Sequence, residues 1–391
     1  MSGSHAAFDG SGTAAPPMRQ WARLHLIADD LTGALDTGAQ FIPLAGPINV
    51  HWRAAAASGS VAMDSGAREL SGDEAEAAVT ARLAQTPPDP SGLHYAKIDS
   101  LLRGHGAREI AAWLRIGAFD RCMIAPAFPH QTRITRGGRQ YRRTDDDWAQ
   151  VATDLCADLA ALGLRVELRR PGDDAPAGVS LWDAESEADL DAIVAAGRAA
   201  DGQVLWCGSG GLAGALARSV SAGNNRIEPA LERPILGLFG SDQAVTAEQV
   251  DACGRYAAII EDDRGSEFAD VSRRLNEDGV ALVRVAIPKG ASRAEAATRI
   301  AGAFGRLALE ITRPATLLVA GGETLRAVCH ALETDHLELV GQIEPGVPCS
   351  FMREGRFDGV RVVSKSGAFG DRNLLRRLVT PDQHPSNGVS A

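Results

Sequence analysis

The sequence predicts an α/β protein with two α/β domains and mainly parallel sheets. Three observations support this prediction. Short apolar runs that suit strands alternate with segments in which apolar residues recur every three or four positions, which is typical of parallel sheets. The 391 residues, 45% of them apolar, suffice for more than one packed core. Near the middle of the chain, residues 223–234 are small, polar and proline-containing and show little periodicity.

We therefore expect a first domain over residues 21–222, a linker over residues 223–234 and a second domain over residues 235–380. Residues 1–20 are rich in Ser, Gly, Ala and Pro and predict a disordered tail, and residues 381–391 are expected to form a second tail. The net charge of −10 argues against a general affinity for nucleic acid or anionic membranes. A site for an anionic substrate must therefore be built locally.

The spacing of the cysteines and the length of the apolar runs predict a cytoplasmic protein. The six cysteines are widely spaced and form no paired motif, as expected of reduced core residues in a cytoplasmic protein. No run of about eighteen apolar residues suggests a membrane helix, and the first residues lack the apolar region of a signal peptide. An oligomer interface cannot be told from a core face here, so a homo-oligomer stays open.

The first informative stretch, residues 24–38, predicts a strand, a tight turn and a helix. Asp29 and Asp30 would stand at the carboxyl end of the strand, where open α/β sheets bind their ligands. Asp30 alone could be a simple helix N-cap. Two adjacent carboxylates at the end of an apolar strand favour a cation or a polar substrate, so both are candidate catalytic residues.

A second strand, polar loop and helix are predicted over residues 93–114. The loop carries Lys97, Asp99, Ser100 and Arg103 within seven residues. Arg103 could hold a carboxylate with two hydrogen bonds, Lys97 could act as a point charge, and Asp99 could accept from a hydroxyl group. On spacing alone, a solvated and salt-bridged helix start is the alternative.

A third apolar strand, residues 122–125, leads into a proline-rich loop and a segment with five arginines. Three aspartates, Asp145 to Asp147, follow directly, so most of these arginines are expected to be neutralised on a solvated surface. Arg133, nearest to the strand end, is the candidate substrate-binding arginine. Residues 148–162 are expected to form an amphipathic helix.

Residues 203–217 predict a strand, a glycine-rich turn and a helix. Gly208, Gly210 and Ala213 fit the relaxed dinucleotide fingerprint GxGxxA. The match comes two hundred residues into the chain and lacks the acidic residue that should follow a second strand. A dehydrogenase is therefore the weaker alternative, although an anion could bind at this helix N-terminus.

Three glycine-containing loops follow buried strands in the second domain. The first has Gly240 and Ser241, with Thr246 and Gln249 in the spacing of a capping box. Ordinary turn geometry could explain any one loop, but three in one domain favour phosphate binding. The candidate nucleotide-binding residues are Ser241, Gly321, Gly322, Glu323, Thr324, Lys365 and Gly367. Lys365 could instead support its own loop.

Read in order, these motifs resemble the four-carbon acid sugar kinase family. They are ADDLTGALDTG, KIDSLLRG, PAFP followed by Arg133, GSGGLA, VAGGETL, EPGVP and KSGAFGD, between about Leu24 and Leu375. The resemblance implies an N-terminal domain that binds the sugar acid, a C-terminal domain that binds ATP, and an active site in the interdomain cleft. It also implies phosphorylation of the terminal hydroxyl of a tetronate or 3-oxo-tetronate, derived for example from threonate or erythronate, in sugar-acid catabolism.

Two positions depart from the usual pattern of the family. Leu101 stands where the family usually has Thr, and the family usually has Gly-Arg-Thr where this chain has Thr132, Arg133 and Ile134. Both departures lie where the substrate would be held. A branched or otherwise modified sugar acid is therefore an alternative substrate.

The expected chemistry is phosphoryl transfer, which needs positioning and charge neutralisation more than covalent catalysis. Asp29 or Asp30 would orient the hydroxyl or act as its base, with Asp99 beside them, while Lys97 and Arg103 hold the carboxylate. The sequence does not decide which aspartate is the base. Mg²⁺ is expected from the chemistry of ATP, but no motif identifies its ligands. A non-catalytic sensor of a sugar acid and a nucleotide is a further alternative.

Overall fold

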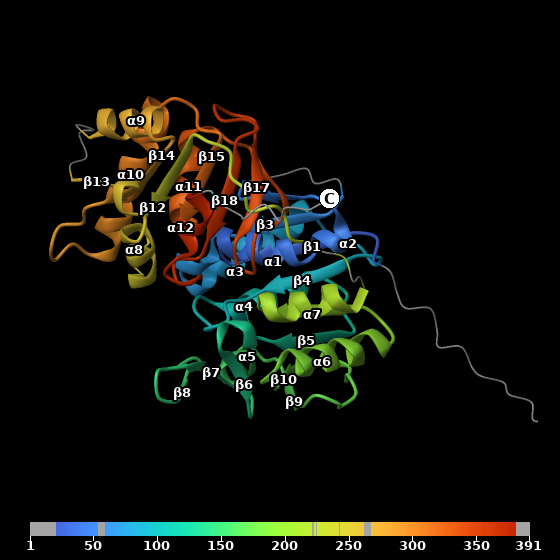
Figure 1. Ribbon diagram of the computed structural model, residues 1–391. Coiled ribbons are helices and arrows are strands. Elements are labelled where there is room, and N and C mark those ends of the chain that lie inside the picture. The colour runs from blue at the N-terminus through green and yellow to red at the C-terminus, as the bar shows by residue number, and fades with distance from the viewer. Residues whose placement is uncertain are drawn as a thin grey trace, which may run out of the picture.

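The computed structural model describes residues 21–53, 59–220, 223, 225–241, 243–261 and 267–380. The predicted tails, residues 1–20 and 381–391, lie outside the described residues. Figure 1 shows two lobes, one formed by the first half of the chain (blue to green) and one by the second half (yellow to red).

Within the described residues, 15 strands join in one sheet that runs through both lobes. From its outer edge inward, the first lobe contributes β9 (Val166–Arg169), β10 (Gly178–Trp182), β5 (Arg121–Ala125), β11 (Val204–Gly208), β4 (Leu93–Lys97), β1 (Leu24–Ala28), β3 (Val61–Asp64) and β2 (Ile48–His51). The second lobe continues with β16 (His336–Gln342), β17 (Pro348–Arg353), β18 (Arg361–Lys365), β15 (Thr316–Ala320), β12 (Ile235–Phe239), β14 (Val280–Val285) and β13 (Ala257–Ile260). The antiparallel pairs, β2 with β16, β16 with β17 and β17 with β18, are those around the junction. The predicted mainly parallel α/β fold is confirmed.

The two lobes share a core as well as a sheet. One cluster of buried apolar side chains includes Leu35 and Leu216 of the first lobe and Leu236, Phe304 and Leu339 of the second. Such a shared core means that the lobes cannot separate without exposing apolar surface to water.

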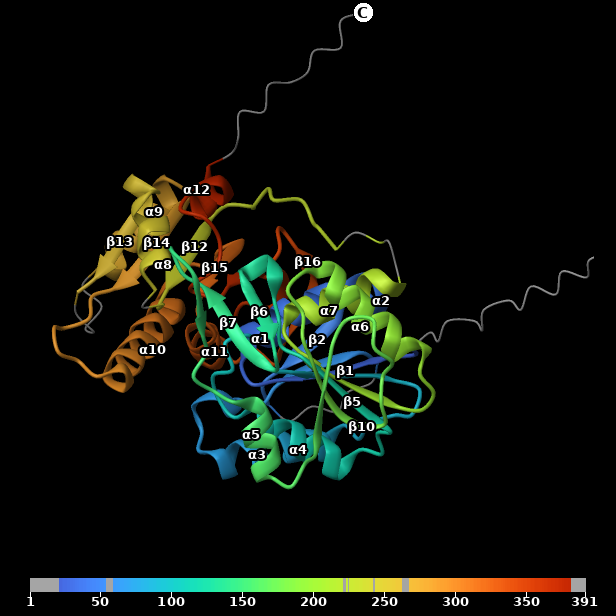
Figure 2. The same ribbon diagram turned by 90° about the horizontal axis from the view of Figure 1, so that it is seen from below.

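Helices cover both faces of the sheet, as buried parallel strands require. In the first lobe, α1 (Leu31–Gln40), α2 (Ile42–Ala45), α6 (Glu187–Ala199) and α7 (Gly210–Val220) lie on one face, and α3 (Gly72–Gln85), α4 (Gly106–Ile116) and α5 (Leu155–Ala161) lie on the other (Figure 2). In the second lobe, α9 (Phe268–Glu277), α10 (Arg293–Glu310) and α11 (Gly322–Ala331) pack on the shared core, whereas α8 (Ala244–Asp251) and α12 (Leu374–Val379) pack on a separate cluster.

The arginine-rich segment forms a small antiparallel sheet of β6 (Arg133–Arg136), β7 (Arg139–Arg143) and β8 (Trp148–Gln150). The predicted helix over residues 148–162 is therefore wrong in its first part, and α5 begins only at Leu155 behind the N-cap Asp154. The arginines are paired with other carboxylates than the expected Asp145 to Asp147: Arg136 pairs with Glu185, and Arg139 pairs with Asp154. This three-stranded sheet, with its own ion pairs, is separate from the main sheet.

Candidate active site

A cavity of about 1200 Å³ lies between the lobes. Every candidate site residue that the sequence suggested lines it: Asp29, Asp30, Lys97, Asp99, Ser100, Arg103, Arg133, Ser241, Gly321, Gly322, Glu323, Thr324, Lys365 and Gly367. The chain thus brings residues that are more than 300 positions apart to one place. Their individual roles stay predictions.

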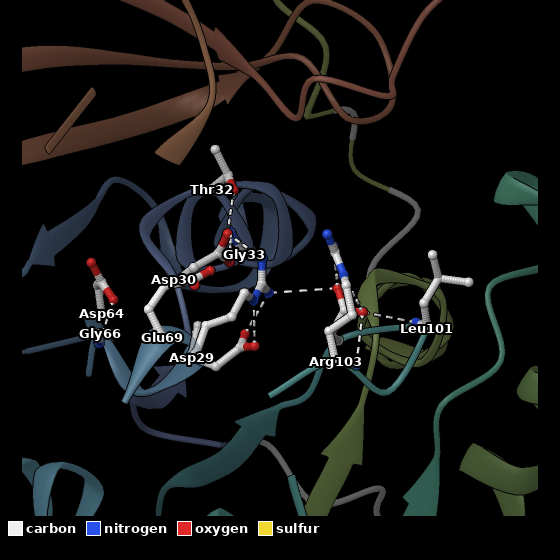
Figure 3. Close-up of polar contacts among 12 residues, drawn as sticks. Asp29, Asp30, Thr32, Gly33, Asp64, Gly66, Glu69, Leu101 and Arg103 are labelled. Atoms are coloured by element: carbon white, nitrogen blue, oxygen red, sulfur yellow. Dashed lines mark hydrogen bonds and ion pairs between the residues drawn. The ribbon is translucent and has the colours of Figure 1, made fainter. Parts of the chain in front are cut away.

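The turn after β1 holds two carboxylates on one guanidinium group (Figure 3). Asp30 is the N-cap of α1, and its Oδ1 accepts a hydrogen bond from the backbone nitrogen of Gly33 at 2.8 Å. Arg68 donates to both oxygens of Asp29 at 2.7 and 2.8 Å and to Asp30 at 2.5 Å. Asp29 is only 1% exposed, so the guanidinium compensates its buried charge. The side chain of Asp30 stays 19% exposed towards the cavity.

Asp99 is an anion fixed by Arg103. The guanidinium of Arg103 donates to both carboxylate oxygens at 2.9 and 2.7 Å, and the backbone nitrogens of Leu101 and Arg103 donate at 3.0 and 3.2 Å. Burial acts to raise the pKa of Asp99, but the hydrogen bonds from Arg103 and the charge of Arg68 lower that pKa well below its usual range overall. Asp99 is therefore a poor proton acceptor. Arg103 is engaged by Asp99 rather than left open for a substrate carboxylate.

Lys97 and Asp36 occupy the part of the cavity beside α1. A methyl group built on Gly33 would lie 3.2 Å from the ammonium nitrogen of Lys97, so glycine lets this cation approach the helix closely. Within the described ranges, nothing forms a hydrogen bond or an ion pair with this ammonium group. Oδ1 of Asp36 likewise has no partner there. Burial raises the pKa of Asp36 to about 6, although the charge of Lys97 opposes this shift.

Ser100 and Arg133 form the next section of the wall. Nη1 of Arg133 donates to Oγ of Ser100 at 2.5 Å, and the amide of Gln140 donates to the carbonyl of Ser100 at 2.7 Å. Thr132 adopts a φ of 56°, in the left-handed region where a β-branched residue is strained. Glycine, the usual family residue at this position, meets no such strain.

Two further carboxyl groups stand near the aspartate pair. Asp64, at the end of β3, accepts from the backbone nitrogen of Gly66 at 2.7 Å and from Arg326 of α11. Burial raises the pKa of Asp64 to about 6, and the charge of Arg326 opposes the shift. Burial, followed by the charge of Asp29, raises the pKa of Glu109 on α4 well above its usual range. The ion pair of Asp64 with Arg326 links the two lobes.

In the second lobe, α11 points its N-terminus at the cavity. Gly321, the N-cap residue, has a φ of 104°, which glycine adopts readily. The free N–H groups of a first helical turn, together with the helix dipole, suit a phosphate group. A methyl group at Gly240 would lie only 2.1 Å from Oγ1 of Thr324, so the end of β12 can approach this turn only with glycine.

The side chain of Lys365 holds the loop that follows β18. Its ammonium group donates to the carbonyls of Ser366 and Gly367 at 2.9 and 3.2 Å and to Oγ1 of Thr246 at 3.2 Å. Of its two suggested roles, this geometry favours support of the loop. Thr246 donates to the carbonyl of Gly367 at 2.8 Å and does not cap α8, and Gln249 donates to loop carbonyls. The predicted capping box is therefore wrong.

An apolar slot completes the second-lobe side of the cavity. It is lined by Phe239, Ile259, Val285, Ile287, Ala297 and Ile300. Ile259 and Ile287 are among the exposed large apolar side chains, at 47% and 39%. Apolar walls beside a few polar groups are usual in small-molecule binding sites.

The two helix N-termini face each other across the cavity. A methyl group on Gly322 would lie 3.5 Å from Oδ2 of Asp30 and 3.4 Å from the backbone nitrogen of Thr32. The first turn of α11 and the carboxylate of Asp30 are therefore close neighbours, although they belong to different lobes.

Sequence reasoning missed Asp36, Asp64 and Arg68. Asp64 is the last residue of an apolar strand, and Asp29 directly follows one, so the same pattern could have revealed Asp64. Asp36 lies within the first motif, but it stands in the middle of the predicted helix, where no strand end marks it as a site residue. Arg68 sits in a short 3₁₀ turn, Ala67–Glu69, and no local pattern marks it.

Together, fold and cavity define a two-lobed α/β enzyme in which one lobe offers cations and carboxylates and the other a phosphate-type turn and an apolar slot. A model described as a sugar-binding N-terminal domain matches residues 24–157, and one described as a nucleotide-binding C-terminal domain matches residues 224–375. The chain belongs to the four-carbon acid sugar kinase family, and it is a phosphotransferase.

Named relatives align over nearly the whole chain. A D-threonate kinase of Cupriavidus necator is 32% identical over 90% of this chain and 95% of that protein. A 3-oxo-tetronate kinase of Pseudomonas fluorescens is 26% identical over 91% of this chain and 96% of that protein. Among solved structures, Haemophilus influenzae protein HI1011 superposes with a TM-score of 0.63 and 18% identity over 90% of this chain and 98% of that chain. The last likeness concerns the fold alone.

Among the described residues, no helix is both long and apolar enough to cross a bilayer.

Proposed function

We propose that the protein uses ATP to phosphorylate the terminal hydroxyl group of a four-carbon sugar acid such as a tetronate or 3-oxo-tetronate. The observation that carries this proposal is the close approach of the two helix N-termini, where a methyl group on Gly322 would lie 3.5 Å from Oδ2 of Asp30. The named relatives act on D-threonate, D-erythronate and 3-oxo-tetronate, which supports this class of acceptor.

The unpaired polar groups of the first lobe suit a short hydroxy acid. Lys97 and Arg133 bind its carboxylate, because both cations line the cavity and Lys97 has no protein partner among the described residues. Asp36 binds a substrate hydroxyl, which gives its orphaned Oδ1 a partner. A chain of four carbons held in this way can direct its terminal hydroxyl towards Asp30.

Asp30 is the proposed base. Both oxygens of Asp29 are occupied by Arg68, and Asp99 is held by Arg103 with a lowered pKa. Asp30 also accepts hydrogen bonds from Arg68, Thr32 and Gly33, but its side chain is 19% exposed to the cavity, whereas that of Asp29 is 1% exposed. The substrate oxygen bonds to the γ-phosphorus, the bond from that phosphorus to the β,γ-bridging oxygen breaks, ADP leaves, and Asp30 takes the hydroxyl proton.

The second lobe holds ATP. The base enters the slot beside Ile259 and Ile287, and the phosphates lie at the first turn of α11 and the loop of Gly367. Hard oxygen donors suit Mg²⁺, and the carboxylate of Glu323 on the first turn of α11 would hold it. Bound there with ATP, the ion would neutralise phosphate charge.

A branched or otherwise modified acid is the second candidate substrate. Leu101 lines the cavity where the family usually has a threonine, so an apolar group replaces a hydroxyl beside the substrate. Leu101→Thr is expected to shift the preference from branched acids towards plain tetronates by about 10-fold, as expected for one or two buried groups.

The direct test measures ADP release with ATP and Mg²⁺ over tetronates, 3-oxo-tetronates, glycerate and branched sugar acids. Asp30→Asn should lower kcat by roughly 10²–10⁴-fold while calorimetry finds ATP affinity unchanged. The matched control is Asp191→Asn, which removes an exposed carboxylate that pairs with Arg218 on the far helices. Turnover that survives in Asp30→Asn would remove Asp30 as base. No turnover on any acid, despite tight ATP binding, would overturn the proposed substrate class.

A further inference from the structure

Two histidines and an aspartate meet at the junction of the lobes, and none of them lines the catalytic cavity. His51 ends β2, Asp335 immediately precedes β16, and His336 begins β16. One ligand atom from each of the three side chains lies within 4.8 Å of the other two. Each of these residue types is an ordinary ligand of transition metals.

The backbone explains why the three side chains converge. The β2–β16 pairing places Leu337 opposite Val50, so the same antiparallel register brings His336 opposite His51. Residues that face each other in this way have Cβ atoms about 4.5–5.5 Å apart. The two imidazole rings lie with centroids 5.0 Å apart, and an oxygen of Asp335 lies 2.9 Å from Nδ1 of His336.

The start of β16 is also fixed by β17, its neighbour on the side away from β2. The backbone nitrogen of Asp335 donates to the carbonyl of Arg353 on β17 at 3.0 Å. Asp335 and His336 are thus held by the second lobe, and His51 is held by the first. The ligand atoms, within 4.8 Å of one another, must draw closer to hold an ion, because ligand atoms of a tetrahedral zinc ion lie about 3.3 Å apart.

We propose that His51, Asp335 and His336 bind one divalent transition-metal ion of the Zn²⁺ type across the junction of the lobes. Two imidazole nitrogens and one carboxylate oxygen form a borderline donor set that suits Zn²⁺ and is unlike the all-oxygen set that Mg²⁺ prefers. Water fills the fourth position. Because its ligands come from both lobes, the ion binds the folded protein and ties β2 to β16.

The test titrates the full-length protein, after treatment with EDTA, with Co²⁺ and follows visible d–d absorption, with Zn²⁺ added as competitor. One Co²⁺ per chain should give the intense absorption of a four-coordinate site, and Zn²⁺ should abolish it. His51→Ala and His336→Ala should each weaken binding at least about 10-fold. The matched control is His330→Ala, a nearby histidine that contacts Arg53 and is outside the cluster.

Folding and activity are checked separately. Circular dichroism and ADP release should be the same in both variants and the control, because the three ligands lie outside the cavity. Zn²⁺ should raise the melting temperature of the wild type and of His330→Ala but not that of His51→Ala. Equal Co²⁺ affinity in wild type and His51→Ala, or the weak absorption of a six-coordinate ion in the wild type, would overturn the proposal.

Discussion

Substitution of Asp36 tests the proposed substrate site in two ways, through the stability of the folded protein and through the KM for the sugar acid. The Asp36 residue is 8% exposed, and its Oδ1 has no hydrogen-bond partner within the described residues. Burial raises its pKa from 3.8 to about 6. A group placed for a substrate in this way is expected to cost folding free energy while the substrate is absent.

The sign of the effect follows from the direction of the shift. The pKa of Asp36 is higher in the folded than in the unfolded state, so the folded state binds this proton more tightly. The stability contributed by the protonated group is fully present below pH 3.8 and is lost as the pH rises through about 6. The shift of roughly 2 pKa units corresponds to about 3 kcal/mol at pH 8. At pH 5 roughly half of this loss has developed.

Asp36→Asn keeps the size of the side chain and removes the charge. The variant should gain stability over the wild type, and this gain should be about 1.4 kcal/mol larger at pH 8 than at pH 5. Urea unfolding at both pH values measures it, and the comparison cancels any pH-independent effect of the amide. Asp191→Asn, on an exposed side chain, should change stability by less than about 0.5 kcal/mol at either pH. A stability gain that does not depend on pH would contradict the raised pKa of Asp36.

The same variant should bind its acid substrate more weakly. Loss of the proposed contact between Asp36 and a hydroxyl should raise KM for the sugar acid about 10-fold or more and leave ATP affinity unchanged. A normal KM would place Asp36 outside the substrate site, whatever its effect on stability.

Three further changes probe the rest of the cavity. Arg68→Gln should destabilise the protein by about 3–5 kcal/mol in urea unfolding, because it leaves buried carboxylates without their cation; an unchanged midpoint would contradict this. Gly240→Ala should weaken ATP binding in calorimetry, since its methyl group would meet Thr324 at 2.1 Å, whereas Gly302→Ala, with a nearest contact of 3.5 Å, should be neutral or stabilising. Burial lowers the pKa of Lys365 to about 8, so the wild type should become more stable relative to Lys365→Met as the pH rises from about 8 to 10.5, which unfolding at pH 7 and 10 would show.

The local part of the fold was readable from the sequence. The strand and helix predicted over residues 24–38 form β1 and α1, because burial on both sides of a strand and the 3.6-residue period leave clear local signals. Residues 148–162 were misassigned because Trp148 and its neighbours pair with β7, and a partner supplied by another strand overrides a helical pattern.

The site was predictable only where it lies next to a strand end. Asp29 and Lys97 follow apolar runs, and the parallel topology then places both at one edge of the sheet. Arg68 escaped notice because its partners are 38 and 39 residues away, a distance that no local pattern encodes. For the same reason the apolar slot, assembled from four separate elements, could not be seen before the chain was folded.

The joined sheet also bears on how the two substrates meet. β2 and β16 are hydrogen-bonded neighbours and the lobes share one core, so a wide opening of the cavity would break strand pairing and expose apolar side chains. Large closure about residues 225–234 is therefore not needed, and Asp30 already lies so close that a methyl group on Gly322 would be 3.5 Å from its Oδ2. The pair of Asp64 with Arg326 fixes the same approach from the other side. Catalysis should then depend on groups placed in advance, which is where phosphoryl transfer gains most.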